Sequence, residues 1–175
     1  MQLSETDPRL NFDWLTESLA VGGRFPRERA AELARSHGIG AIVDLREEDC
    51  DDEGHLREAG LDFLHLPAPD MEALGVSGLD RGVEFVRDRL LRGEKVLIHC
   101  QHGIGRSPLL ALCVLVDGGR PPLDALEHAK TRRAALSLSR AQYDGWAAWL
   151  TLHGHPVPSY HEFGCIAYRH LAAPA

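Results

Sequence analysis

One stretch in the middle of the chain, Val96–Leu110, places a cysteine and an arginine at the two ends of a short loop. The apolar, partly β-branched residues before the loop predict a buried strand, and the proline and leucines after it predict the start of a buried helix. Five residues separate Cys100 from Arg106, and two of them, Gly103 and Gly105, let the backbone turn without a side chain in the way. A loop of this kind at a helix N-terminus directs its N–H groups toward one centre. The sequence therefore predicts a cradle for an anion of the size of phosphate.

The polar side chains of this loop suit phosphoryl transfer. A cysteine at a helix N-terminus and beside a cation loses its proton more readily than a free one, so we expect Cys100 to act as a thiolate nucleophile. Arg106 offers a planar fork that can hold two phosphoryl oxygens through the transition state. The Ser107 hydroxyl follows directly, and we expect it to donate to the sulfur and ease its departure from a phosphocysteine. The residues expected to bind phosphate through the loop are Gln101, His102, Gly103, Ile104, Gly105 and Arg106.

The run His99-Cys100-x-x-Gly103-x-x-Arg106-Ser107 matches HCxxGxxR[ST], the signature of the protein tyrosine phosphatase superfamily. The match includes the histidine before the cysteine and the hydroxyl after the arginine, and it lies between a strand and an apolar helix. The chain thus resembles a cysteine-dependent, dual-specificity-like phosphatase. The resemblance implies hydrolysis of phosphate monoesters through a phosphocysteine, with no metal and no other cofactor, and a supporting role for His99.

Other roles for Cys100 account for less of the sequence. A free cysteine is commonly a small buried hydrophobic residue, but that role does not explain the loop. His99, Cys100 and His102 form a possible metal ligand set, yet zinc sites normally need two spaced ligand pairs, and no C-x2-C or H-x3-H partner appears elsewhere in the sequence. Two alternatives stay open: a phosphate-binding pseudophosphatase, and a sulfurtransferase of the rhodanese kind, whose loops usually lack this glycine and Arg-Ser ending.

Expulsion of an alkoxide or phenoxide needs a proton donor, which we expect on a separate loop. A short apolar strand ends in two prolines and Asp70, thirty residues before Cys100. In dual-specificity-like phosphatases the acid is an aspartate after such a strand, so the resemblance implies that Asp70 is the acid. Asp70 alternatively caps a helix that begins near Met71. Asp62 and Asp80 are weaker candidates, because the first lies within the strand and the second within a predicted helix.

Gln142 follows Ser139, a residue type that commonly caps helices. A late glutamine orients the attacking water in some relatives, and the resemblance makes Gln142 the candidate for this task. The alternative is a surface glutamine on a helix.

The predicted elements alternate between strands and helices in the first two thirds of the chain and are helical thereafter. This order predicts a three-layer α/β sandwich with a central, mostly parallel sheet flanked by helices, as in dual-specificity phosphatases. No low-complexity linker divides the chain, so we expect a single phosphatase domain over residues 1–175, with 156–175 as an appended C-terminal helix. The expected strands are 14–26, 41–46, 63–66 and 96–98, and the expected helices are 27–37, 78–92, 108–116, 123–133 and 139–149.

The net charge and the low lysine content limit the classes of molecule that the protein is expected to bind. The net charge is −7 and the sequence contains two lysines, Lys95 and Lys130, which disfavours nucleic acid or an anionic membrane surface as the partner. Members of the superfamily that act on highly anionic phosphoinositides tend to carry lysines in this loop, so the resemblance, with no lysine here, implies a phosphoprotein or a modestly charged small phosphate ester as substrate. Small phosphate esters such as inositol phosphates, phosphoinositides or nucleotides remain the alternative. The acidic stretch 47–53 is either a solvated turn or a surface that repels acidic substrates.

No apolar run has membrane length, and the N-terminus lacks a basic-then-apolar leader. We therefore expect a cytoplasmic protein without membrane insertion, in a compartment that keeps the thiolate reduced. The sequence does not indicate an oligomeric state.

Overall fold

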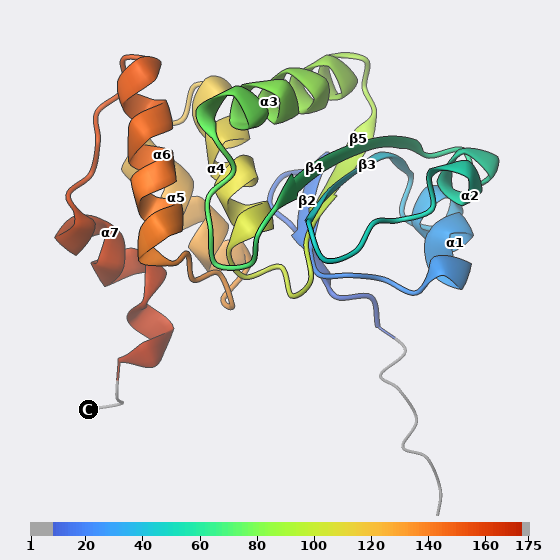
Figure 1. Ribbon diagram of the computed structural model, residues 1–175, viewed down its shortest axis with the longest axis horizontal. Coiled ribbons are helices and arrows are strands. Elements are labelled where there is room, and N and C mark those ends of the chain that lie inside the picture. Colours follow the sequence, from blue (N-terminus) through green and yellow to red (C-terminus); the bar gives the residue numbers. More distant parts are fainter. Residues whose placement is uncertain (1–8, 173–175) are drawn as a thin grey trace, which may run out of the picture.

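A five-stranded sheet forms the middle of the molecule in the computed structural model, which describes residues 9–172 (Figure 1). The spatial order is β1 (Phe12–Trp14), β2 (Leu19–Gly22), β5 (Lys95–His99), β3 (Ile39–Arg46) and β4 (Asp62–Ala68). β1 runs antiparallel to β2, and the other three pairs are parallel. The prediction of a mostly parallel sheet is confirmed.

Helices cover both faces of this sheet, which confirms the three-layer arrangement (Figure 1). Neighbouring residues of β3 show the two faces: Val43 joins the larger core cluster, and Ile42 joins the smaller one, because successive side chains of a strand point to opposite sides. The larger cluster includes buried side chains of α3 (Val76–Leu91), α4 (Arg106–Asp117), α5 (Pro122–Arg132), α6 (Arg140–Leu152) and α7 (Tyr160–Ala167). The smaller includes side chains of α1 (Ala30–Arg35) and α2 (Glu53–Glu58). Short 3-10 turns lie at Arg27–Arg29 and Arg169–Leu171.

The parallel strands bring three loops to one edge of the sheet. Arg46, at the end of β3, pairs in register with Ala68 at the end of β4, and Asp44 of β3 pairs with His99 at the end of β5. The segments that follow these strands therefore start side by side, as ligand-binding loops do at the carboxyl edge of parallel sheets. The loop after β5 leads directly into α4, a helix that is buried along its whole length except its last residue. This burial fixes the loop at its C-terminal end.

Three local expectations differ from the structure. The segment 14–26 is not one strand: β1 and β2 form a hairpin whose turn is held by the Thr16 hydroxyl, which accepts from the N–H groups of Ser18 and Leu19. The acidic stretch leads into α2, capped by Asp52, which accepts from the His55 N–H. The helix after β4 begins at Val76 with Gly75 as N-cap, so capping by Asp70 is wrong.

The C-terminal segment carries α7, and this helix contributes to the main core. Phe163 is fully buried and lies with its ring 4.9 Å from that of Tyr143 and 6.2 Å from that of Trp146. Within residues 9–172, no helix is long and apolar enough to cross a membrane. The extension of one domain over all of 1–175 stays a prediction, and its ends, 1–8 and 173–175, lie outside the described residues.

Truncation of Phe163 tests whether α7 is part of the folding unit. We expect Phe163→Ala to lower the free energy of unfolding by about 3–5 kcal/mol, because a fully buried phenyl ring leaves a cavity. Urea unfolding followed by tryptophan fluorescence measures the change. The control is Leu171→Ala, since Leu171 is exposed and its loss should change stability by less than about 0.5 kcal/mol. Equal stability of the two variants would show that α7 folds apart from the core.

Candidate active site

The loop between β5 and α4 closes around the sulfur of Cys100. Cys100 is 3% exposed, and its Sγ lies 3.3 Å from the Ser107 Oγ and accepts from the Gly103 N–H at 3.3 Å. The Ser107 hydroxyl donates its hydrogen to the carbonyl oxygen of Gly22, in β2, at 3.2 Å. Ser107 and Cys100 are therefore in contact, and donation from the Ser107 hydroxyl to the sulfur stays a prediction.

The carbonyl groups of this loop accept hydrogen bonds from residues that lie outside the loop. Four successive carbonyl oxygens accept hydrogen bonds from other parts of the chain: Gln101 from Arg24 N at 3.1 Å, His102 from Arg133 Nη2 at 3.0 Å, Gly103 from Arg133 Nε at 2.6 Å, and Ile104 from Ser137 N at 2.9 Å. The N–H groups of Gln101, His102, Ile104 and Gly105 donate to no acceptor in the part of the chain that the structure describes. With its oxygens bonded outward, the loop keeps these donors available for an anion.

Arg133 is a residue of this site that sequence reasoning missed. Its side chain is buried, bonds two loop carbonyls, and is itself held by Asp13 (Nη1 to Oδ2, 2.8 Å) and Asn11 (Nη2 to Oδ1, 3.0 Å). Gly103 adopts φ +70°, and a Cβ there would lie 2.4 Å from the Arg133 Nη2, so glycine is required for the close approach. In the sequence, Arg133 is one of two consecutive arginines at a helix end, and no local pattern separates it from Arg132.

The guanidinium of Arg106 is held in place by Glu48 and by the carbonyl group of Ala68. Its Nη1 and Nη2 donate to the two carboxylate oxygens of Glu48, each at 2.7 Å, and Nη1 also donates to the Ala68 carbonyl at 2.9 Å. A guanidinium has five N–H donors, so the edge formed by Nε and the second Nη2 hydrogen is left. The Nε is buried without a partner among the described residues. This edge matches two oxygens of a phosphoryl group.

Glu48 changes the interpretation of the acidic stretch. The hydrogen bonds from Arg106 lower the pKa of the Glu48 carboxyl from its ordinary 4.5 to about 2, so the pair stays charged at neutral pH. Glu48 lies on an exposed bend with its side chain 43% exposed, as a solvated turn predicts, and its carboxylate in addition orients the arginine. A local sequence pattern gives no sign of the contact, because Glu48 and Arg106 are 58 positions apart.

A buried polar network supports the same loop. His99 Nε2 lies 2.6 Å from the Asp51 Oδ2, and Asp51 Oδ1 accepts from Arg46 Nη2 at 2.8 Å. Arg46 in turn donates from Nε and Nη2 to the two oxygens of Asp44. The network ties the segment after β3 to the end of β5, and thereby places Glu48 beside Arg106. His99 belongs to this network, and its supporting role stays a prediction.

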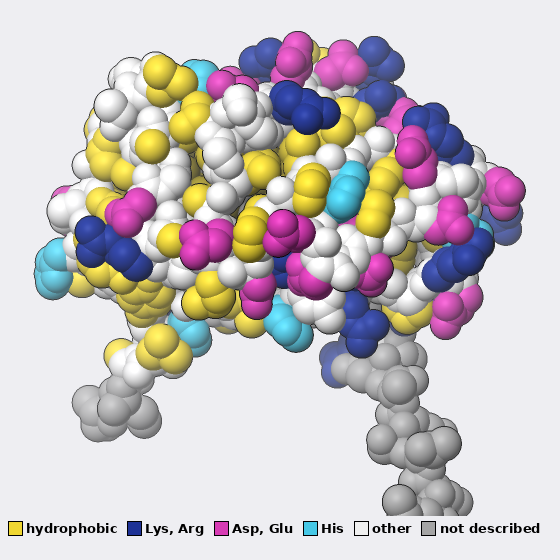
Figure 2. Space-filling view, viewed as in Figure 1, with side chains coloured by type: hydrophobic (Ala, Val, Ile, Leu, Met, Phe, Trp, Pro, Cys, Tyr) yellow, Lys and Arg dark blue, Asp and Glu magenta, His cyan; other side chains and the backbone are white. Residues whose placement is uncertain are grey.

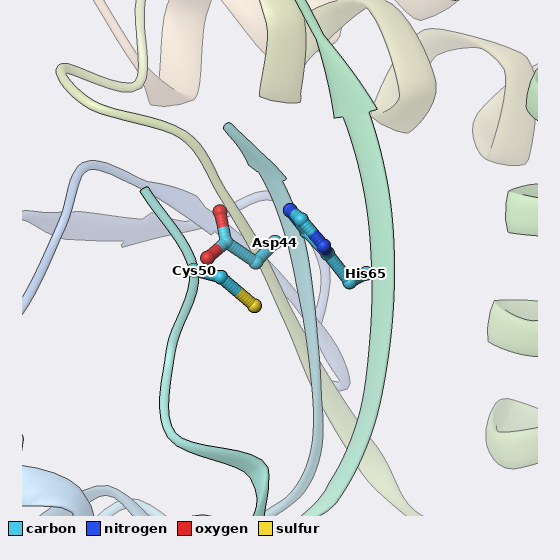
Figure 3. Close-up of side chains that lie close together, drawn as sticks. All are labelled: Asp44, Cys50 and His65. Carbon is cyan, nitrogen blue, oxygen red and sulfur yellow. The ribbon is translucent and has the colours of Figure 1, made fainter. Parts of the chain in front are cut away.

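Asp44, Cys50 and His65 lie close together beside this network (Figure 3). Each Asp44 oxygen already accepts two hydrogen bonds: Oδ1 from the backbone N–H and Nε of Arg46, and Oδ2 from Arg46 Nη2 and the Asp51 N–H. His65 Nε2 lies 2.6 Å from the Arg46 carbonyl. Burial and the neighbouring carboxylates of Asp44 and Asp51 raise the pKa of the Cys50 thiol, whereas a metal ligand must be a thiolate. We interpret the group as part of the ion-pair network.

Asp70 lies at the mouth of the site, on the segment after β4. Its Oδ1 accepts from the Met71 N–H at 3.0 Å and lies 3.5 Å from Arg106 Nη2. Its side chain is 69% exposed and thus within reach of a bound ligand. The two weaker candidates are engaged elsewhere: Asp62 pairs with Arg89, and Asp80 accepts from the indole N–H of Trp149. The geometry favours Asp70 among the three, and its catalytic role stays a prediction.

Gln142 is buried at the start of α6 rather than on the surface. Its Oε1 accepts from the Ser139 N–H at 2.8 Å, and its Nε2 is 3.4 Å from the Glu72 carbonyl. A Cβ on Gly105 would lie 2.3 Å from the Gln142 Oε1, so the absence of a side chain at Gly105 makes room for the amide. Gln142 thus contacts both the loop between β5 and α4 and the segment that carries Asp70.

These residues enclose a pocket of about 110 Å³. Its lining consists of Asp70, Met71, Cys100, His102, Ile104, Gly105, Arg106, Ser137 and Gln142. Two apolar side chains in this lining are strongly exposed, Met71 at 61% and Ile104 at 40%. Figure 2 shows hydrophobic and acidic side chains interspersed on the face that is viewed there, without a continuous basic surface. The site is thus a small anion pocket with an apolar rim.

The family whose profile matches residues 24–120 is described as "Polymorphic toxin system, DSP-PTPase phosphatase". Human dual specificity protein phosphatase 1 is 30% identical over 123 residues, which are 68% of this chain and 32% of that protein. A probable protein tyrosine phosphatase type IVA from Dictyostelium discoideum is 39% identical over 51 residues, 29% of this chain and 31% of that one. The chain thus matches about a third of the length of these relatives.

Solved structures show the same fold. The active form of Tk-PTP is 25% identical with a TM-score of 0.74, over 79% of this chain and 95% of that one. Human DUSP28 is 18% identical with a TM-score of 0.71, over 87% of this chain and 99% of that one, a likeness that shows the fold alone. The profile match covers more than half of the sequence and includes the whole loop from Cys100 to Arg106. The chain belongs to the cysteine-based protein tyrosine phosphatases of the dual-specificity type.

Proposed function

We propose that this phosphatase transfers the phosphoryl group of a monoester to Cys100 and then to water. The observation that carries the proposal is the Nε of Arg106, which has no partner among the described residues, on a guanidinium that Glu48 holds beside the Cys100 sulfur and beside loop N–H groups without an acceptor in residues 9–172. A dianionic phosphoryl group matches this set of donors in charge and in size.

In the first step, the thiolate of Cys100 attacks phosphorus while the ester oxygen departs on the opposite side. The S–P bond forms and the P–O bond to the leaving group breaks. Asp70, protonated for this step, gives its proton to the departing oxygen. Arg106 and the loop N–H groups stabilise the equatorial oxygens throughout.

In the second step, a water molecule attacks the phosphocysteine. Its oxygen forms a bond to phosphorus, Asp70 accepts its proton, and the S–P electron pair returns to sulfur. The Ser107 hydroxyl, 3.3 Å from Sγ, turns from the Gly22 carbonyl to donate to the thiolate as it leaves. Gln142 lines the same pocket, which supports a part in placing the water.

The rim of the pocket supports an aryl phosphate, and in particular a phosphotyrosine-bearing protein, as the substrate. Met71 and Ile104 offer apolar contact to an aromatic ring. Among the described residues that line the pocket, Arg106 is the one permanently charged cation, which favours a single phosphoryl group over a polyphosphorylated ligand. The need for a reduced thiol at Cys100 supports a cytoplasmic location.

Replacement of the nucleophile tests the mechanism. We expect Cys100→Ser to lose all measurable hydrolysis of p-nitrophenyl phosphate, because a serine hydroxyl is not ionised in the same cradle. Acid quench of the parent during turnover should trap a phosphorylated Cys100, detected by mass spectrometry of peptides. The control is Cys165→Ser, an exposed thiol outside the pocket, which should turn over like the parent. Sustained turnover by the Cys100 variant would reject the mechanism.

A substrate panel tests the proposed substrate class. We expect kcat/KM for phosphotyrosine peptides to exceed that for phosphoserine peptides and for phosphoinositides, because the aromatic ring gains contact with Met71 and Ile104. A phosphate-release assay at equal substrate concentrations measures the ratios. A preference for phosphoinositides would contradict the assignment of an aryl phosphate and leave the two-step chemistry intact.

The clamp formed by Arg133 predicts a separate effect on phosphate binding. Arg133→Lys keeps the positive charge but loses the planar guanidinium that donates to two loop carbonyls and to the side chains of Asp13 and Asn11. We expect kcat/KM to fall at least about tenfold and competitive inhibition by inorganic phosphate to weaken in parallel, since misplacing groups by about 1 Å is costly. Arg132→Lys, at the exposed neighbouring arginine, is the matched control. Unchanged inhibition by phosphate in Arg133→Lys would refute the clamp.

The pair formed by Glu48 and Arg106 predicts a pH dependence of stability. The pKa of Glu48 is about 2 in the folded protein and 4.5 ordinarily, so the folded state favours the ionised form. This contribution to stability is fully present above pH 4.5 and is lost as the pH falls toward 2. We expect the stability difference between the parent and Glu48→Gln to shrink over that interval, measured by urea unfolding at each pH. A difference that stays constant from pH 6 to pH 2 would contradict the pairing.

A further inference from the structure

The segment between β4 and α3, residues 69–75, carries Asp70 and is called the acid loop below. In Figure 1 this connection runs alongside α6 before it reaches α3. Its N-terminal end is fixed by the hydrogen bond from Arg106 to the Ala68 carbonyl. Three contacts with α6 fix the residues that follow Asp70.

The first two contacts come from the N-terminal end of α6. The Ser139 hydroxyl accepts from the Gln142 N–H at 3.1 Å, as a helix N-cap does, and donates its own hydrogen to the Met71 carbonyl at 2.5 Å. The Gln142 side chain closes the capping box on the Ser139 N–H, and its Nε2 lies 3.4 Å from the carbonyl of Glu72. Two successive carbonyls of the acid loop are therefore held by one helix end.

The third contact is a close approach at Gly145. A Cβ on Gly145 would lie 2.4 Å from the Ala73 Cβ, a distance that side chains do not tolerate. Glycine in the interior of a helix is unfavourable compared with alanine, so its presence in α6 needs a reason. The approach of the acid loop supplies one. Gln142 and Gly145 are three positions apart, which puts them on the same face of the helix.

Met71 has an unfavourable, left-handed backbone conformation, so the acid loop must be held by its surroundings. It is the one non-glycine residue with positive φ, +66°, among the residues that the structure describes. An unbranched side chain in this region is uncommon and persists where surrounding contacts determine the backbone. The carbonyl of this same residue is the one that Ser139 binds.

We propose that Ser139, Gln142 and Gly145 form a latch that fixes the acid loop and so places Asp70 over the leaving group. The inference rests on the proposed function, since it assigns these three as positioning residues for the acid. Their contacts with substrate are not required. Loss of the latch should therefore lower kcat/KM most for esters with a basic leaving group, which must be protonated to depart.

Gly145→Ala is the direct test. Its methyl group meets Ala73, whereas alanine itself favours the helix, so the variant displaces the loop without weakening α6. We expect kcat/KM to fall about tenfold to a hundredfold for phenyl phosphate and to change little for 2,4-dinitrophenyl phosphate, whose leaving group departs without protonation. Ala73→Gly in the same chain removes the opposing methyl group, so the double variant should regain most of the phenyl phosphate activity. Gly164→Ala in α7, where an added Cβ makes ordinary contact at 3.4 Å, is the matched control.

A second pair of variants separates the latch from helix capping. Ser139 and Ser159 both cap a helix through a capping box, but the Ser139 hydroxyl also donates to the acid loop, whereas that of Ser159 donates to Glu162 within its own box. Both alanine variants lose a cap. We expect only Ser139→Ala to show the selective loss on phenyl phosphate.

The outcomes distinguish the latch from the acid itself. Asp70→Asn serves as the reference and should show the same dependence on the leaving group in stronger form. The latch is overturned if Gly145→Ala slows both esters equally, if Ala73→Gly restores nothing, or if Ser139→Ala behaves as Ser159→Ala does, while Asp70→Asn remains selective. If Asp70→Asn itself shows no selectivity, the proposed acid is wrong, and the failure lies in the function on which the latch rests.

Discussion

The outward orientation of four carbonyl groups is the constraint on which the active site depends. A short loop presents its N–H groups inward only when its oxygens have acceptable partners outside, since buried carbonyls must be hydrogen-bonded. Arg133 satisfies two of the four, and backbone N–H groups of Arg24 and Ser137 satisfy the others. The inward donors are thus a result of contacts made on the far side of the loop.

The charged groups around this loop are arranged in pairs. Each of the three buried arginines near the site faces a carboxylate: Arg46 faces Asp44, Arg106 faces Glu48, and Arg133 faces Asp13. Removing a charge from water is costly, and removing one partner of such a pair leaves the other uncompensated. The pairing explains how an acidic chain keeps cations buried next to a nucleophilic sulfur.

The sequence predicted the part of the site that lies within one short stretch. Cys100, Arg106 and Ser107 lie within eight residues of one another, so the candidate nucleophile could be predicted from this stretch alone. The strand and the helix beside it show simple hydrophobic patterns, so the fold class could be predicted as well. Asp70 could be singled out because it follows a predicted strand, although the helix that it was expected to cap begins only at Val76. The contacts of Glu48 and Arg133 could not be predicted from the sequence. These two residues act through contacts 58 and 30 positions away, and an acidic turn or a helix end looks the same whether or not such a contact exists.

The fixed guanidinium of Arg106 has a consequence for the end of the reaction. Glu48 and the Ala68 carbonyl hold the side chain in one orientation, so a phosphate ion that enters the pocket does not have to order it. Inorganic phosphate, the product of the proposed reaction, carries the same kind of oxygen atoms as the proposed substrate and can accept from the same donors. Preorganisation of this kind does not distinguish an ester from a free anion. In the proposed reaction, we therefore expect inorganic phosphate to compete with the substrate for the same donors, so that turnover depends on the concentration of free phosphate.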